Sequence, residues 1–164
     1  MPGTFVPDEG YQIFTTLSEY RQGVDTVIAS AQASLDVYDT DLADLGFEEH
    51  ARHESLRSFL AQNTARRLRV VLSDPLFIQQ RAARTQNLMR DFSHQVEIRV
   101  LAEKRDADVF IYSDVGVCLY RPQHDHAKSV LTSEDLSRYR LLAGRFAQMF
   151  DVAEQSVSSA VLGL

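Results

Sequence analysis

Hydrophobic residues along the chain alternate between the spacing of a strand and the spacing of a helix. Compact apolar stretches predict four strands, at residues 11–15, 34–38, 68–72 and 96–101. Apolar positions three or four residues apart predict three intervening helices, at residues 16–31, 47–62 and 75–93. A two-strand hairpin with a Gly-containing turn follows at residues 108–121, and the most regular helical pattern runs from Leu136 to Ala153.

Polar residues mark where these helices begin. Thr16 and Glu19 have the spacing of a capping box, in which each side chain accepts a hydrogen bond from a free backbone N–H group. Asp74 followed by Pro75 favours a helix start, since proline is tolerated in the first turn. Thr132 or Ser133 is expected to cap the last helix.

The predicted order is β-α-β-α-β-α-β-β-β-α, which defines an α/β fold. Strands joined through helices form right-handed crossovers, so the first four strands are expected to lie parallel, with the hairpin adding antiparallel strands. We therefore predict a mixed, mostly parallel sheet with helices on both faces. Residues 1–164 are expected to form a single domain, with residues 1–10 and 156–164 as loose tails.

Composition narrows the expected partners. Hydrophobic residues make up 45% of the 164 residues and charged residues 24%, as in ordinary globular domains. The net charge of −6 disfavours binding to nucleic acid or to anionic lipid. No stretch is apolar enough to span a bilayer, no secretory signal is recognised, and Cys118 is expected as a lone buried thiol. These features predict a cytoplasmic protein that needs no membrane.

Four short segments resemble one half of a phospholipase D-like protein, in particular a bacterial branch found alone or beside an acetyltransferase domain. These segments are Leu35–Leu42, Arg69–Asp74, Val96–Arg99 and Phe110–Gly116. In active members, as the resemblance implies, a His-x-Lys-x4-Asp motif lies on the hairpin and its histidine attacks phosphorus. Active members also pair two halves about a two-fold axis, so the resemblance implies a homodimer or an acetyltransferase-type partner.

The chain departs from this motif at its reactive positions. Ala107 stands in the histidine slot, Val109 in the lysine slot, and Arg121-Pro122 where Gly-Ser is expected. Asp114 matches the motif aspartate, but aspartate is also the ordinary residue of a tight turn. Because a phosphohistidine cannot form without histidine, no catalytic residue is assigned from the motif.

Acidic residues follow two strands that are expected to be parallel. Asp39 and Asp41 come after the second strand and Asp74 after the third, at the sheet edge where ligands of α/β folds bind. Clustered carboxylates there could hold Mg²⁺. The alternative, which we favour, is that these carboxylates cap turns and helix starts.

Histidines and arginines supply the remaining candidates. His126 and Lys128 form an H-x-K outside the hairpin, and His124 with His126 could hold a transition metal; exposed loop positions explain both patterns. Arg66, Arg67 and Arg69 are interpreted as part of a solvated basic face.

The sequence therefore predicts a phospholipase D-like module without catalysis that acts by binding or assembly, with no cofactor and no metal. Its candidate ligand-binding residues are Asp39, Asp74, Asp114, His126 and Lys128. Two alternatives stay open: a phosphodiesterase or nuclease with an atypical site, and a domain that binds a small anion or a nucleotide.

Overall fold

The computed structural model describes residues 10–101, 103 and 106–157. The expected tails fall outside the described residues except for Gly10, Ser156 and Val157. In the part of the chain that is described, no helix is both long and apolar enough to cross a membrane.

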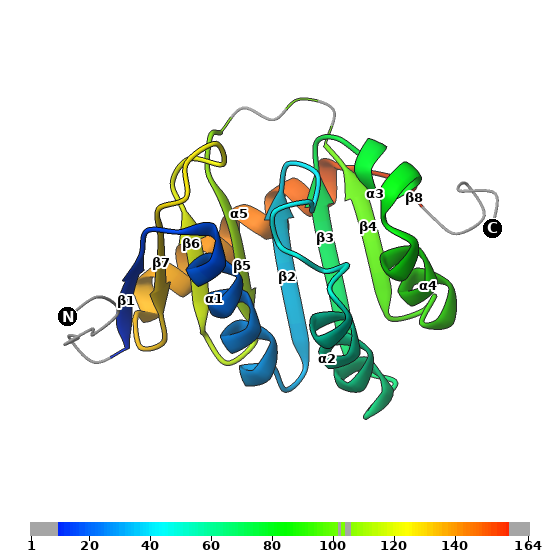
Figure 1. Ribbon diagram of the computed structural model, residues 1–164, viewed down its shortest axis with the longest axis horizontal. Coiled ribbons are helices and arrows are strands. Elements are labelled where there is room, and N and C mark those ends of the chain that lie inside the picture. The colour runs from blue at the N-terminus through cyan, green and yellow to red at the C-terminus, as the bar shows by residue number, and fades with distance from the viewer. Residues whose placement is uncertain (1–9, 102, 104–105, 158–164) are drawn as a thin grey trace.

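One twisted sheet of eight strands runs through the molecule (Figure 1). Its spatial order is β1-β7-β6-β5-β2-β3-β4-β8. The strands are β1 (Tyr11–Phe14), β2 (Ser34–Asp39), β3 (Arg67–Leu72), β4 (Val96–Val100), β5 (Val109–Ser113), β6 (Cys118–Arg121), β7 (Ser129–Thr132) and β8 (Glu154–Val157).

The predicted α/β class with a mixed sheet is confirmed, but one expected pairing is wrong. Strands β2, β3 and β4 are parallel, as the crossover argument requires. Strand β1 was expected in the same parallel set, yet it lies at the far edge and pairs antiparallel with β7, with Phe14 opposite Ser129. Of the seven pairings among the described strands, only β2–β3 and β3–β4 are parallel and the other five are antiparallel, so the sheet is mixed but not mostly parallel as expected.

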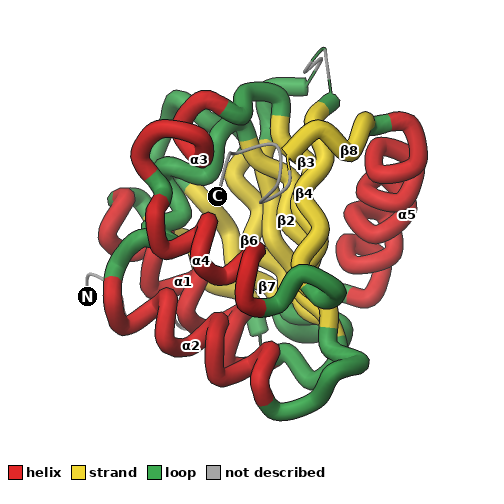
Figure 2. The backbone as a smooth tube through the Cα atoms, turned by 90° about the vertical axis from the view of Figure 1, so that its right-hand side faces the viewer, coloured by secondary structure: helices red, strands yellow, loops and turns green. Residues whose placement is uncertain are grey.

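Helices cover both faces of the sheet, as predicted. Figure 2 shows α1 to α4 on one face, here named the α1 face, and α5 alone on the other, the α5 face. The helices are α1 (Leu17–Ser30), α2 (His50–Ala61), α3 (Leu76–Arg81), α4 (Ala83–Asp91) and α5 (Leu136–Val152).

Strand alternation divides the core between these faces, because successive side chains of a strand point to opposite sides. Leu35, Val37 and Ile111 pack into the larger cluster under α1 and α2. Tyr38 and Phe110 pack into a smaller cluster against α5. The face of any strand residue therefore follows from its position along the strand.

The helix ends confirm one prediction and correct another. Thr16 and Glu19 form the expected capping box at α1, with the Glu19 backbone N–H donating to Thr16 Oγ1 at 3.1 Å. Helix α5 is capped by Asp135, whose carboxylate accepts from the Arg138 N–H at 2.9 Å. The cap expected at Thr132 or Ser133 is wrong, since Thr132 belongs to β7.

Two other helices differ from the expected ranges. Helix α2 begins at His50, because residues 40–48 form bends and turns after β2. The helix expected at residues 75–93 is split at Ala82, whose φ of −124° and ψ of 58° are not helical. The Glu48 carboxylate accepts from the backbone N–H groups of Arg84 and Thr85, which gives α4 a start of its own.

Candidate functional site

Residues from four neighbouring strands meet at one edge of the sheet on the α1 face. Antiparallel pairing of β5 with β2 brings the start of β5 beside the end of β2, and the register continues through β6 to β7. We name this set the edge row: Asp39, Val109, Arg121 and Ser129. The edge row occupies the carboxyl end of the parallel strands, where the sequence placed its candidate ligands.

The two motif slots carry no reactive side chain at this edge. Ala107 is exposed just before β5, and its carbonyl accepts the His124 N–H at 2.9 Å. Val109 is completely buried, so the lysine slot is filled by packed hydrocarbon. The structure therefore offers neither a nucleophile nor a cation at these two positions.

Arg121 supplies a cation that the sequence analysis did not single out. Its guanidinium is 6% exposed and donates to Asp44 Oδ2 at 2.9 Å and to the His126 carbonyl at 2.5 Å. The guanidinium also lies over the Tyr20 ring, 5.0 Å from its centroid. Since Asp44 balances its charge and its Nε and Nη1 bond to two different loops, Arg121 serves to join the loops around the edge row.

Asp39 is the buried acid of the edge row. Its Oδ2 accepts the Leu42 N–H at 2.7 Å, and only 4% of the residue is exposed. Burial raises the pKa of Asp39 from 3.8 to about 6, with Asp41 and Asp44 adding negative charge nearby. Leu42 has a φ of +76°, a conformation unfavourable for leucine, and this hydrogen bond helps to hold it.

Asp74 lies on the loop after β3, next to the end of β2. The Asp74 N–H donates to the Thr40 carbonyl at 2.9 Å, so the two loops meet as expected for parallel strands. The Asp74 carboxylate, however, accepts the Leu76 N–H at 2.9 Å and organises the start of α3. Within the described ranges, no three His, Cys, Asp or Glu side chains come together in a way that could hold a metal ion.

His126 and Lys128 lie in the exposed loop between β6 and β7, at the same end of the sheet as Ala107. The His126 ring is 69% exposed, with Nε2 4.0 Å from Asp125 Oδ1. This loop contacts the edge row through the His126 carbonyl, which accepts a hydrogen bond from Arg121, and not through the imidazole.

Asp114 lies at the opposite end of the sheet, in the turn between β5 and β6. One carboxylate oxygen accepts three backbone N–H groups, from Gln32 at 2.9 Å, Ala33 at 2.9 Å and Ser34 at 3.1 Å. Its pKa is lowered: burial alone would raise it, but these hydrogen bonds outweigh burial. Asp114 therefore ties the hairpin to the start of β2.

A second ion pair, which the sequence analysis also missed, lies at the start of β5 on the α5 face. Arg145 of α5 donates to both carboxylate oxygens of Asp108, at 2.6 and 2.9 Å, and the Tyr120 hydroxyl donates to Asp108 at 2.9 Å. The hydrogen bond to Asp108 raises the pKa of Arg145. One available signal was the aspartate directly before an apolar strand.

Comparisons with known proteins agree with this architecture. A family model described as a domain of unknown function (DUF7931) matches residues 16–159. No curated protein matches the sequence.

Three solved structures share the fold at low sequence identity. The archaeal chromatin protein TrmBL2 has a TM-score of 0.67 at 11% identity, over 94% of this chain and 57% of its own length. NucT from Helicobacter pylori has a TM-score of 0.65 at 9% identity, covering 88% and 98%. Phosphatidylserine synthase from Haemophilus influenzae has a TM-score of 0.55 at 11% identity, covering 90% and 40%. At these identities the likeness shows the fold alone, which is the expected phospholipase D-like type.

Proposed function

Because the chain belongs to this family of unknown function (DUF7931), whose description assigns no activity, we propose from the geometry that it is a non-catalytic phospholipase D-like module acting by assembly. The observation that carries the proposal is Val109, which is completely buried in the position of the motif lysine. Exposed Ala107 stands in the histidine position, so covalent phosphoryl transfer has no attacking group there.

The surroundings of the edge row support a loss of catalysis. The Asp44 carboxylate neutralises Arg121, and the Asp114 carboxylate accepts hydrogen bonds from three backbone N–H groups. An enzyme that stabilises a phosphoryl transition state needs preorganised positive charge facing the substrate. Here the arginines near β5 instead hold acidic side chains of this chain.

The assay that tests the loss of catalysis is hydrolysis of bis(p-nitrophenyl) phosphate, with and without Mg²⁺ or Mn²⁺. We expect the wild-type rate to equal the buffer rate in every condition. His126→Ala and Asp74→Ala should change nothing, because neither side chain belongs to a catalytic group. Metal-stimulated hydrolysis that either substitution abolishes would establish the phosphodiesterase alternative instead.

Exposed apolar side chains support assembly through the α5 face. Leu136, Leu141 and Val152 of α5 are 56, 63 and 71% exposed. Ile13 of β1 is 47% exposed and points to the same face, since its neighbour Phe14 packs into the core under α1. Large exposed apolar side chains on this side of the molecule are what a partner would cover.

We propose that a second copy of the chain covers this surface as a symmetric homodimer. Size-exclusion chromatography with light scattering should give the dimer mass for wild type and the monomer mass for Leu141→Glu. Leu76→Glu is the matched control, because Leu76 is 51% exposed on α3 at the opposite face, and it should remain dimeric. A monomeric wild type, or a dimeric Leu141→Glu variant, would refute a homodimer formed through α5. An acetyltransferase-type partner is the competing occupant, and a monomeric wild type would favour it.

A further inference from the structure

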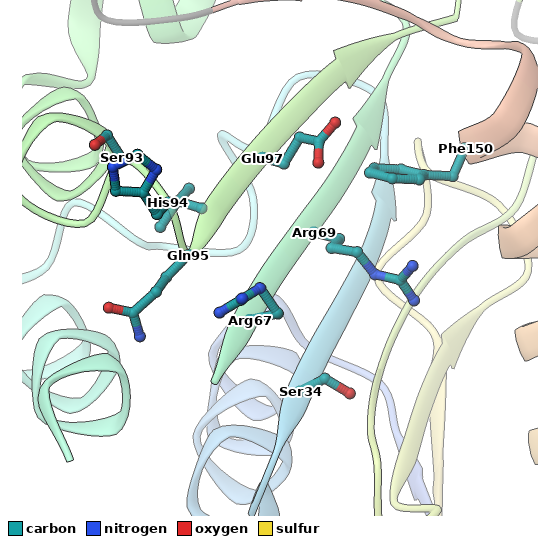
Figure 3. A pocket seen from close by; sticks show the side chains of 9 residues that line it. Ser34, Arg67, Arg69, Ser93, His94, Gln95, Glu97 and Phe150 are labelled. Atoms are coloured by element: carbon teal, nitrogen blue, oxygen red, sulfur yellow. The ribbon is translucent and has the colours of Figure 1, made fainter. Parts of the chain in front are cut away.

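A groove of about 400 Å³ opens on the α5 face at the amino ends of β2, β3 and β4. It therefore lies at the opposite end of these strands from the edge row. Figure 3 shows its walls: Arg67 and Arg69 on β3, Glu97 on β4, His94 before β4, and Phe150 of α5 above Arg69.

Arg69 is held rigidly in the groove wall. Its Nε and Nη2 donate to the two oxygens of Asp36 at 2.9 and 2.8 Å, and Asp36 is nearly buried. The guanidinium also contacts the Phe146 and Phe150 rings, at 5.3 and 5.1 Å from their centroids. Since 38% of the side chain is exposed, and no acceptor for Nη1 exists within the described ranges, Arg69 presents a preorganised donor to solvent.

Arg67 lies two residues earlier on the same strand and is exposed. Its Nη1 donates to the carbonyls of Thr64 at 2.7 Å and Arg66 at 3.0 Å, which restrains the guanidinium at the start of β3. Its Nε and Nη2 have no acceptor among the residues that the structure describes. Arg67 thus offers further donors beside those of Arg69.

The other polar groups of the groove are also mainly donors. Over the described residues, neither the Ser34 hydroxyl nor the His94 ring forms a hydrogen bond. The acid in the wall, Glu97, already accepts from Arg99 at 2.7 Å, and Asp36 is paired with Arg69. Arg67 is left as an uncompensated positive charge on a chain whose net charge is −6. The unused donors and the uncompensated charge of Arg67 favour an oxyanion as the ligand.

The side chains around the groove also indicate which kind of oxyanion can bind there. Phe150 already carries two arginines that a nucleobase would have to displace, since Arg69 and Arg99 lie over its ring at 5.1 and 3.9 Å from the centroid. Positions 67 and 69 are about 6.6 Å apart along the strand. In Figure 3 their guanidinium groups lead away in different directions, Arg67 toward the start of β4 and Arg69 across β2. Two separated guanidinium groups with open donors fit a ligand with two anionic groups better than a single free phosphate.

We propose that this groove binds a small molecule carrying two phosphate groups, one at Arg67 and one at Arg69. At Arg67 the open Nε and Nη2 form a fork that matches the geometry of phosphate oxygens, Arg69 adds its Nη1, and Ser34 and His94 supply additional donors. This site uses none of the edge row and does not depend on the proposed assembly. A refuted dimer would therefore leave the binding prediction unchanged.

Isothermal titration calorimetry at low ionic strength tests the proposal with three probes: inorganic phosphate, pyrophosphate and fructose bisphosphate. We expect fructose bisphosphate to bind about tenfold more tightly than inorganic phosphate, because only the longer ligand can reach both arginines. Pyrophosphate should fall between them. Arg67→Gln should weaken fructose bisphosphate binding by about tenfold, the worth of one charge-assisted contact.

Arg81→Gln is the matched control, since Arg81 is exposed on α3 and has no partner among the described side chains. This variant should keep the wild-type affinity, and both variants should keep the wild-type melting temperature. No measurable heat with fructose bisphosphate, or equal weakening by Arg67→Gln and Arg81→Gln, would overturn the proposal. Tighter binding of a short single-stranded oligonucleotide than of the bisphosphate would also overturn it, in favour of a polymer ligand.

Discussion

Asp39 at the end of β2 is a carboxyl group that the fold keeps away from water. It is 4% exposed, and burial raises its pKa from 3.8 to about 6. Because the folded state binds this proton more tightly than the unfolded state, Asp39 favours folding most below about pH 4. That contribution is lost as the pH rises through about 6, where the buried group becomes charged.

Asp39→Asn is therefore expected to stabilise the protein at neutral pH. Asparagine keeps an oxygen for the Leu42 N–H and cannot ionise, so the free energy of unfolding at about pH 8 should rise by up to about 3 kcal/mol. At about pH 4 the variant and wild type should unfold alike. Urea denaturation across this pH range measures the difference.

Asp151→Asn removes the same formal charge from an exposed position of α5 and serves as the control. It should change the free energy of unfolding only slightly. A difference between Asp39→Asn and wild type that does not change with pH would contradict the assignment of the raised pKa to Asp39.

The sequence revealed which reactive groups are missing and which residues replace them, but not the ion pairs that organise their surroundings. The Ala107 and Val109 positions could be read from local spacing, whereas Asp114 lies in the expected turn but its carboxylate bonds to residues 32–34, about 80 positions away. The Arg121–Asp44 pair joins residues 77 positions apart, and the Arg145–Asp108 pair joins residues 37 apart. Such contacts depend on how loops and α5 pack, and no local pattern contains that information.

Among the elements, α1 begins where it does because of hydrogen bonds between residues close in sequence. Thr16 Oγ1 and the Glu19 carboxylate satisfy backbone N–H groups at the first turn, at 3.1 and 3.2 Å. Thr16→Ala should lower the free energy of unfolding by about 1 kcal/mol, because one of these N–H groups loses its acceptor. Thermal or chemical unfolding measures this change.

Thr26→Ala in the middle of the same helix is the matched control. Thr26 is exposed and donates only to the Gln22 carbonyl, so its loss should be neutral or slightly stabilising through higher helix propensity. Equal destabilisation by the two substitutions would mean that the capping box contributes nothing particular.

The spacing of hydrophobic residues was sufficient to predict some of the other elements and insufficient for the rest. Helices α1 and α5 were predicted well, because their apolar stripes are long and regular. Strands β7 and β8 were missed, since each has four residues and their pairing with β6 and β4 is long-range. The break at Ala82 was missed because its cap, Glu48, comes from a distant loop.

At the scale of the molecule, a strand's place in the sheet was harder to predict than its existence. The crossover rule correctly made β2, β3 and β4 parallel neighbours. It misplaced β1, because the partner of β1 is β7, the strand that the sequence did not reveal. The antiparallel insertion of β5 beside β2 is what aligns Val109 with Asp39 and Arg121 in the edge row.

The proposed absence of catalysis rests on Val109, which is completely buried where the phospholipase D-like motif has its lysine. The most direct measurement is a single-turnover assay, with purified protein in molar excess over a fluorogenic phosphodiester. We predict no product above the buffer control, with or without divalent metal, for wild type and for His126→Ala. Product formation by the wild type that one single-residue substitution abolishes would contradict the central claim.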